Sequence, residues 1–120
     1  MTPRPNVAWA EVTIDSSDTA RAAKFWSDLL DLPARAQQLE GWFQLGPAVN
    51  GGPVINIQPV PEEKAGKARV HLDLWVDDLP ATVALVGRLG GNCLEEHRDG
   101  QWTVAVMADP EGLEFCLVAG

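Results

Sequence analysis

Hydrophobic and polar residues follow a strand-then-helix pattern in the first half of the chain. Residues 7–14 alternate between apolar and polar side chains, which is typical of a half-buried strand. Residues 19–32 repeat apolar side chains at helical spacing after a Ser-Ser-Asp cap, and Pro33 ends this predicted helix. Two short apolar runs, 41–45 and 54–58, flank a turn-rich segment and predict two further strands.

The second half repeats this order after a connector rich in proline and charge, residues 59–67. Residues 69–76 alternate in the same way as the opening strand. A second helix is expected to begin after Asp78 and to end at the Gly-Gly pair 90–91. Three more strand candidates close the chain, at residues 94–97, 102–107 and 113–118.

An offset of 60 residues superposes the two halves, as a duplicated module would require. The offset places Asp18 on Asp78 at the two expected helix caps. It also matches apolar strand positions, such as Val12 on Leu72. The matched caps and faces, rather than the few identities, carry the interpretation of a repeat.

We therefore predict an α+β fold of two βαβββ modules in tandem. The modules are expected at about residues 7–60 and 68–119, with the linker at 59–67, and together they form a single domain over 1–120. The predicted sheet is curved, mixed or antiparallel, and lies around a cleft, while the helices cover its outer face.

The same offset brings polar side chains from equivalent strands to a shared cleft. It pairs Glu11 with His71 and Asn56 with Cys116, so a carboxylate, an imidazole, a carboxamide and a thiol would converge. Three more polar residues share the strand parity of this set and would line the same surface: Gln58, Asp73 and Glu114. Asp73 and Glu114 act there as a general acid or base, or face solvent at the rim.

Composition and charge narrow the classes of partner. The chain has 120 residues, 46% of them hydrophobic, which is enough for an ordinary globular core. Seventeen acidic residues against nine basic ones give a net charge of −8, which repels phosphate backbones and anionic membranes. We therefore expect no nucleic-acid partner and no membrane partner.

Processing signals and cysteines point to a reducing compartment. No signal-peptide core and no membrane span follows the opening residues MTPRPN, so a cytoplasmic location is expected. Cys93 and Cys116 lack CxxC spacing, which favours free thiols over a disulfide. Both thiols are equally consistent with small buried hydrophobic residues, and Cys116 is also consistent with a soft metal ligand.

At this point the chain resembles a known family. The stretches HLDLWVDD (71–78), DPEGLEFCLV (109–118) and INIQPVPEEK (55–64) resemble the vicinal oxygen chelate superfamily of glyoxalase I, extradiol dioxygenases and bleomycin-type resistance proteins. Among its members, the short bacterial glyoxalase-like proteins are the most similar. The resemblance spans nearly the whole chain and implies the fold more strongly than any one reaction.

The resemblance also implies a metal site with one ligand from each of four strands. Glu11 falls on the first ligand position and His71 on the third, whereas Cys116 occupies the fourth, where a Glu is usual. The second position is Asn56, or Gln58 if the register slips by two. The implied metal is divalent: zinc, nickel, iron or manganese.

Two functions remain open from the sequence. In the first, a glyoxalase-like lyase or isomerase binds a small oxygenated molecule in the cleft, and catalytic Glu11 and His71 hold a metal or the substrate itself. In the second, a metal-free binding or sequestering protein of the bleomycin-resistance kind holds a cationic ligand between acidic groups and tryptophans such as Trp102. Packing is the competing interpretation of the tryptophans. The resemblance implies a homodimer in either case.

Overall fold

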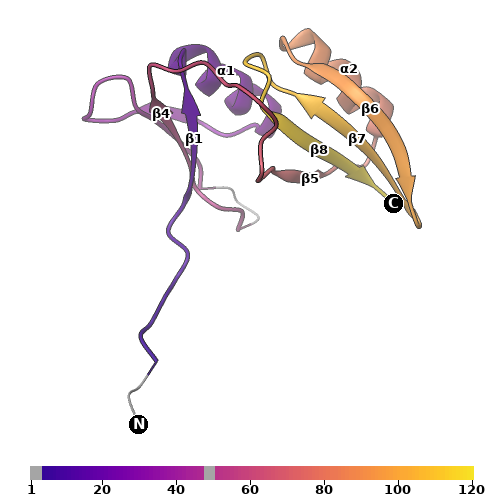
Figure 1. Ribbon diagram of the computed structural model, residues 1–120, viewed down its shortest axis with the longest axis horizontal. Coiled ribbons are helices and arrows are strands. Elements are labelled where there is room, and N and C mark those ends of the chain that lie inside the picture. Colours follow the sequence, from indigo (N-terminus) through magenta and orange to yellow (C-terminus); the bar gives the residue numbers. More distant parts are fainter. Residues whose placement is uncertain (1–3, 48–50) are drawn as a thin grey trace.

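The computed structural model describes residues 4–47 and 51–120. The described residues form two four-stranded sheets with one helix packed on each (Figure 1). The first sheet has the strand order β1-β4-β3-β2. Module one contains β1 (Val12–Ser16), α1 (Thr19–Leu30), β2 (Ala34–Ala36), β3 (Phe43–Leu45) and β4 (Ile55–Pro59).

The second sheet has the equivalent order β5-β8-β7-β6. Module two contains β5 (Asp73–Trp75), α2 (Leu79–Arg88), β6 (Asn92–Asp99), β7 (Trp102–Ala108) and β8 (Glu114–Ala119). In each sheet the first and last strands of the module pair in parallel, and the remaining pairs are antiparallel. The tandem βαβββ fold predicted from the sequence is confirmed, with mixed sheets.

The strand registers reproduce the offset of 60 residues. Thr13 lies opposite Asn56 between β1 and β4, and Asp73 lies opposite Cys116 between β5 and β8. The third strand departs from the offset by two residues, because Gln44 faces Asn56 whereas Val106 faces Cys116. The duplication is therefore strict for the parallel pair of each sheet and looser for its antiparallel part.

Both helices begin at the expected aspartate caps. The Asp18 carboxylate accepts a hydrogen bond from the Arg21 N–H at 3.2 Å, and Asp78 accepts one from the Ala81 N–H at 3.0 Å. Each carboxylate satisfies a backbone donor that the first helical turn leaves without an intrahelical partner. The caps fix where each helix starts and therefore how it lies across its sheet.

One hydrophobic core joins the two modules. Trp26 and Phe25 of α1 are buried together with Phe115 of β8, and the Trp26 and Phe115 rings lie 4.9 Å apart at their centroids. Edge-to-face contacts of this kind add to the stability gained from burial alone. Because the contact crosses from the first helix to the last strand, the core positions one sheet relative to the other.

The structure differs from the predicted opening strand. Regular pairing starts at Val12, and residues 4–11, here called the N-terminal arm, run away from the body of the molecule (Figure 1). Alternation alone does not make a strand, because the arm has no neighbouring strand among the described residues to complete its hydrogen bonds. The second opening strand is also shorter than predicted and covers only Asp73–Trp75.

Two further differences concern an element and a side chain. The sequence pattern missed β2, because all three of its residues are exposed and show no apolar alternation. Cys93 is exposed rather than a buried hydrophobic residue, whereas Cys116 is buried, and both are free thiols. No helix among residues 4–47 and 51–120 is long and apolar enough to cross a membrane.

Candidate functional site

Three potential metal ligands gather on the face of the second sheet opposite its helix. His71 precedes β5, Asp73 begins it, and Cys116 lies directly opposite Asp73 on β8. Their donor atoms all lie within 4.8 Å of one another. The His71 Nδ1 and Asp73 Oδ1 atoms are 3.1 Å apart. Strand parity explains the grouping, because residues 71 and 73 share one face of the strand.

The environment of Cys116 keeps its thiol neutral. Burial raises the pKa of the Cys116 thiol, and the negative charge of Asp73 raises it further. Only 9% of this residue is exposed, whereas His71 and Asp73 are exposed. Without a bound cation, Cys116 is therefore a poor nucleophile, because the thiolate is the reactive form.

The donor set of this group suits a divalent metal. It offers one imidazole nitrogen, one carboxylate oxygen and one sulfur, a mixture that zinc accepts and that magnesium or calcium does not favour. His71, Asp73 and Cys116 would hold such an ion, which would supply Lewis-acid polarisation of a bound oxygen. The Glu11 carboxylate is not a member of this group.

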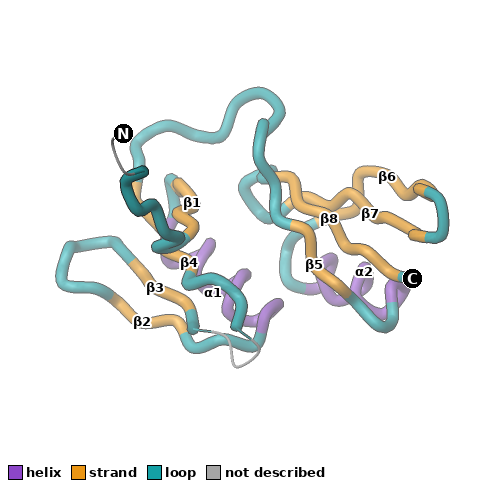
Figure 2. Tube along the Cα trace, turned by 90° about the horizontal axis from the view of Figure 1, so that it is seen from below, coloured by secondary structure: helices purple, strands orange, loops and turns teal. Residues whose placement is uncertain are grey.

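Glu11 and Asn56 lie instead on module one. Together with Trp42 and Gln44 they line a hollow of about 310 Å³. Asn56 is buried, and its Oδ1 accepts a hydrogen bond from Gln44 Nε2 at 3.2 Å. The structure therefore places the equivalent residues of the two modules on two sheets that lie side by side (Figure 2), rather than in one pocket.

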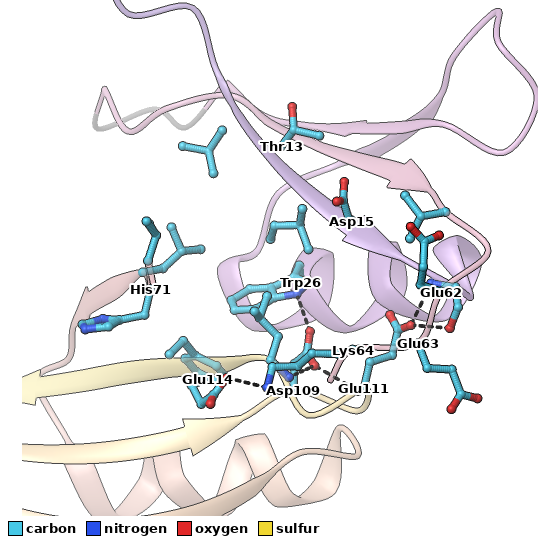
Figure 3. A pocket seen from close by; sticks show the side chains of 18 of the residues that line it. Thr13, Asp15, Trp26, Glu62, Glu63, Lys64, His71, Asp109, Glu111 and Glu114 are labelled. Carbon is cyan, nitrogen blue, oxygen red and sulfur yellow. Dashed lines mark hydrogen bonds and ion pairs between the residues drawn. The ribbon is translucent and has the colours of Figure 1, made fainter. Parts of the chain in front are cut away.

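The largest cavity lies between the two modules and measures about 400 Å³ (Figure 3). Its walls come from β1, α1, the linker and the turn between β7 and β8. The apolar side chains of its wall include Val12, Ile14, Trp26, Leu72, Leu113 and Phe115. The acidic residues of its wall are Asp15, Glu62, Glu63, Asp109, Glu111 and Glu114. Such a cavity combines an apolar interior with a negative field.

The linker is fixed across this cavity by one ion pair. Lys64 Nζ lies 2.9 Å from Glu114 Oε1, and the two side chains are 23% and 15% exposed. The Ala68 N–H also donates to Glu114 at 3.3 Å. The hydrogen bond from Lys64 lowers the pKa of Glu114, so this carboxylate stays ionised as a structural partner. Its role as a free general acid is correspondingly weakened.

Asp109 forms a second contact between the modules, which the sequence pattern did not reveal. Its Oδ2 accepts from Trp26 Nε1 at 3.2 Å, and its Oδ1 accepts from the Glu111 and Leu113 N–H groups at 2.9 Å. Burial raises the pKa of Asp109. The Asp-Pro-Glu-Gly turn signalled a turn, but not the partner 83 residues earlier in the chain.

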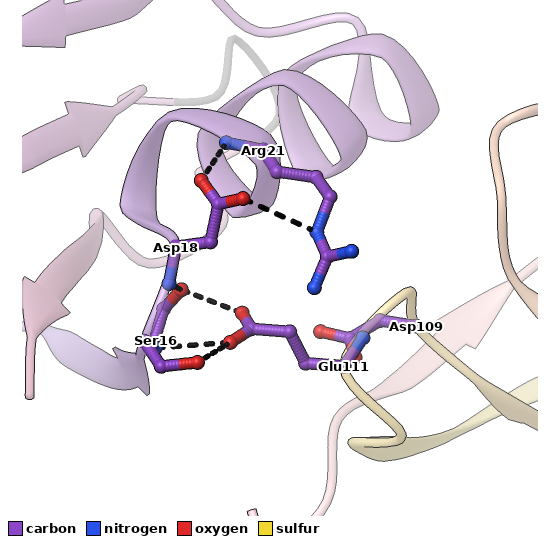
Figure 4. A network of polar contacts seen from close by, with 6 residues as sticks. Ser16, Asp18, Arg21, Asp109 and Glu111 are labelled. Carbon is purple, nitrogen blue, oxygen red and sulfur yellow. Dashed lines mark hydrogen bonds and ion pairs between the residues drawn. The ribbon is translucent and has the colours of Figure 1, made fainter. Parts of the chain in front are cut away.

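Glu111 completes the connection at the start of α1 (Figure 4). Its carboxylate accepts from Ser16 Oγ at 2.5 Å and from both the N–H and the Oγ of Ser17 at 2.9 Å. Ser16 is 2% exposed and its Oγ also accepts from the Asp18 N–H. Two acidic side chains of one turn thus hold module two against module one.

The remaining predicted site residues lie apart from the inter-module cavity. Trp102 contacts Trp75, with ring centroids 5.0 Å apart, and neither residue belongs to the buried core. Trp75 lies two residues beyond Asp73 on β5, and is 74% exposed. Gln58 is half-buried on β4, opposite Asp15 of β1. An aromatic pair therefore flanks the group of His71, Asp73 and Cys116.

The fold and this arrangement define a protein of the glyoxalase class. Residues 11–118 match the family described as the glyoxalase-like domain, and the chain belongs to that family. The structural relatives below come from the wider glyoxalase, bleomycin resistance and dioxygenase superfamily. No curated protein sequence matches the chain.

Solved structures share the fold at low sequence identity. A glyoxalase/bleomycin resistance protein/dioxygenase family enzyme from Burkholderia phytofirmans PsJN superposes with a TM-score of 0.75 at 16% identity, covering 92% of this chain and 96% of its own. The fosfomycin resistance protein FosX from Listeria monocytogenes gives 0.77 at 14%, covering 97% and 95%. A glyoxalase/bleomycin resistance protein from Albidiferax ferrireducens T118 gives 0.68 at 20%, covering 93% and 98%. These similarities show the fold alone.

Proposed function

We propose that this protein is a lyase or isomerase that binds a small oxygenated organic molecule beside a divalent metal. The observation that carries the proposal is the convergence of His71, Asp73 and Cys116 within 4.8 Å on an exposed sheet face. Zinc, nickel, iron and manganese are the metals implied by the family. Membership of the family supports the proposal, since its fold is shared by metal-dependent enzymes.

The chain's own residues supply binding and proton transfer at this site. Asp73 accepts a hydrogen bond from His71 Nδ1, which orients the ring and leaves Nε2 to face a ligand. The neighbouring Trp75 and Trp102 rings provide an aromatic wall for the organic part of the substrate. A carboxylate acting as general base would then remove a proton next to the polarised oxygen.

Glu11 is the carboxylate we propose for that step, and it requires a second copy of the chain. Within one chain Glu11 lies in the hollow of module one, while His71 lies against module two. A homodimer that brings module one of one copy against module two of the other would join them. We therefore propose a homodimer, in which Glu11 and His71 act together from different subunits.

Metal analysis tests the proposal directly. Protein purified without an affinity tag should contain stoichiometric zinc, nickel, iron or manganese by mass spectrometry, and His71→Ala should remove it. His97→Ala is the matched control, because His97 is an exposed histidine of the same sheet that lies outside the group. Metal-free native protein, or metal retained by His71→Ala, would sink the metal-dependent function.

A second candidate function is metal-free binding of a cationic aromatic molecule in the inter-module cavity. The observation that favours it is the acidic wall of that cavity. Asp15, Glu62 and Glu63 make no hydrogen bond or ion pair with any described residue, and buried Trp26 contributes to the apolar wall. Unpaired carboxylates beside apolar surface favour an organic cation over an anion.

Fluorescence titration separates this candidate from the enzyme. A cationic dye such as methylene blue should quench tryptophan emission saturably, and a Glu62→Gln, Glu63→Gln double variant should bind it about tenfold more weakly. Glu40→Gln is the control, because Glu40 is an exposed carboxylate outside the cavity wall. Equal affinities in all three proteins would exclude the cavity as the cation site.

Two broader properties belong to the same proposal. We propose a cytoplasmic location, which fits the free thiols Cys93 and Cys116. We also propose that residues 1–120 act as one domain, with modules at about 7–60 and 68–119 joined by the linker 59–67. The core shared by α1 and β8 supports a single folding unit.

A further inference from the structure

The N-terminal arm, residues 4–11, leaves two large apolar side chains without cover. Trp9 is 94% exposed and Val7 is 87% exposed, the two highest fractions among the exposed large hydrophobic residues of the described chain. The arm extends away from both sheets (Figure 1). An extended segment of eight residues reaches about 26 Å. The radius of gyration of 15.7 Å exceeds the about 13.6 Å expected for a compact chain of this length.

The pattern of the arm continues one face of the first sheet. Val7, Trp9 and Glu11 have the same parity, and β1 continues that parity into its exposed positions Thr13 and Asp15. The arm therefore presents its apolar side chains as a strand would, although no neighbour pairs with it among the described residues. An exposed strand-like segment carrying a tryptophan favours an intermolecular contact over solvent.

The arm also differs in charge from the rest of the chain. Arg4 is the only charged residue among the first ten, while the remaining chain carries all seventeen acidic residues and eight of the nine basic ones. The arm is thus complementary to the body of another copy, and a strongly acidic partner surface is available on the same polypeptide. Its charge does not suit the arm for a basic partner.

A matching acceptor lies on the second sheet. Trp75 and Trp102 stack at 5.0 Å, and Trp75 is 74% exposed. Val118 lies opposite Trp75, and Asp99 lies opposite Trp102 at the edge of the sheet. The acceptor therefore combines an exposed aromatic pair with adjacent apolar surface and a carboxylate, which complements a segment that carries Trp9 and Arg4.

We propose that the N-terminal arm of one copy docks on the Trp75 and Trp102 pair of a second copy, with Trp9 as its anchor. This inference rests on the homodimer proposed above and names the segment that forms it. In a two-fold dimer each contact occurs twice, so two arms and two acceptors contribute. Buried tryptophans are the residues that most often carry the affinity of such an interface.

Sedimentation equilibrium tests the docking. Native protein should be a dimer, and Trp9→Ala should raise its dissociation constant at least about 30-fold, as loss of one anchor does at other interfaces. Trp75→Ala should weaken the dimer similarly while the circular dichroism spectrum stays native. Leu39→Ala is the matched control, because Leu39 is 65% exposed yet belongs neither to the arm nor to the acceptor.

Cross-linking identifies the contact itself. In a Cys93→Ser background, a Trp9→Cys chain mixed with a Trp75→Cys chain should form a disulfide-linked dimer on mild oxidation, and neither chain alone should form it. A native dimer that Trp9→Ala leaves intact, with no cross-link in the mixture, overturns arm docking while the homodimer stands. A native monomer at all concentrations overturns both the arm contact and the homodimer.

Discussion

The Cys116 thiol is protected in two ways, by burial and by the carboxylate beside it. Both effects raise its pKa, whereas Cys93 is exposed and also has a raised pKa. We expect iodoacetamide at pH 7.5 to modify Cys93 at least about tenfold faster than Cys116, because only Cys93 is accessible. Peptide mass spectrometry over time measures both rates. Equal rates would show that Cys116 is accessible.

The Asp73 charge can be separated from burial. Asp73→Asn removes the negative charge that raises the Cys116 pKa but leaves burial in place. The alkylation rate of Cys116 should therefore rise in this variant, while the rate of Cys93 stays the same. A Cys116 rate that does not change would mean that accessibility alone limits the reaction.

Asp109 is the buried acid whose removal should cost most stability. Its carboxylate accepts hydrogen bonds from Trp26, Glu111 and Leu113, and Asp109→Ala would leave those donors unpaired. Unsatisfied buried donors cost about 1–3 kcal/mol each, so we expect a loss of about 3 kcal/mol or more in urea unfolding. Asp99→Ala at the exposed end of β6 should change stability by less than about 0.5 kcal/mol. Comparable losses in both variants would contradict this role.

At the level of elements, the linker is a segment whose contact depends on pH. Hydrogen bonding from Lys64 lowers the pKa of Glu114, so the folded state holds this proton less tightly than the unfolded chain does. The pair therefore stabilises the fold above the ordinary carboxyl pKa, and that stability is lost as pH falls through the lowered value. Lys64→Met should destabilise the protein at pH 7 and make little difference at pH 3.

Urea midpoints at the two pH values measure this effect. Lys67→Met is the control, because Lys67 is a linker lysine with no ion pair among the described residues. An equal effect of Lys64→Met at pH 7 and pH 3 would show that the Lys64 side chain acts through packing and not through the charge of Glu114.

How far the elements were predictable depended on local signals. Asp18 and Asp78 marked the helix starts because capping needs only a carboxylate three residues before its donor. The offset of 60 residues anticipated the parallel register of Thr13 with Asn56 and of Asp73 with Cys116. The strand β2 escaped prediction, since it is held by pairing with β3 and has no buried side.

The candidate site was predictable only within one sheet. Strand parity placed His71, Asp73 and Cys116 on one face, and the structure brings them together. Parity says nothing about how two sheets are oriented, so it did not reveal that Glu11 lines a different hollow. The contacts of Glu111 with Ser16 and Ser17 join residues more than ninety positions apart, which no local pattern encodes.

At the scale of the whole molecule, Glu111 is the main polar connection between the modules. Its carboxylate accepts three hydrogen bonds from Ser16 and Ser17, and Ser16 is almost fully buried. Hydrogen bonds to a charged acceptor contribute about 1.5–3 kcal/mol. Glu111→Ala should therefore destabilise the protein by about 2–4 kcal/mol in urea, more than Glu40→Ala, which removes an exposed carboxylate.

The same variant distinguishes a polar latch from a shared core. Trp26 and Phe115 still join α1 to β8 when Glu111 is replaced, so unfolding should remain one cooperative transition at a lower midpoint. Tryptophan fluorescence and far-UV circular dichroism should give coincident curves for Glu111→Ala. Separate transitions would mean that the modules unfold independently once Glu111 is lost. In that case the carboxylate contacts, and not the aromatic core, would hold the two sheets in the relative position that forms the inter-module cavity.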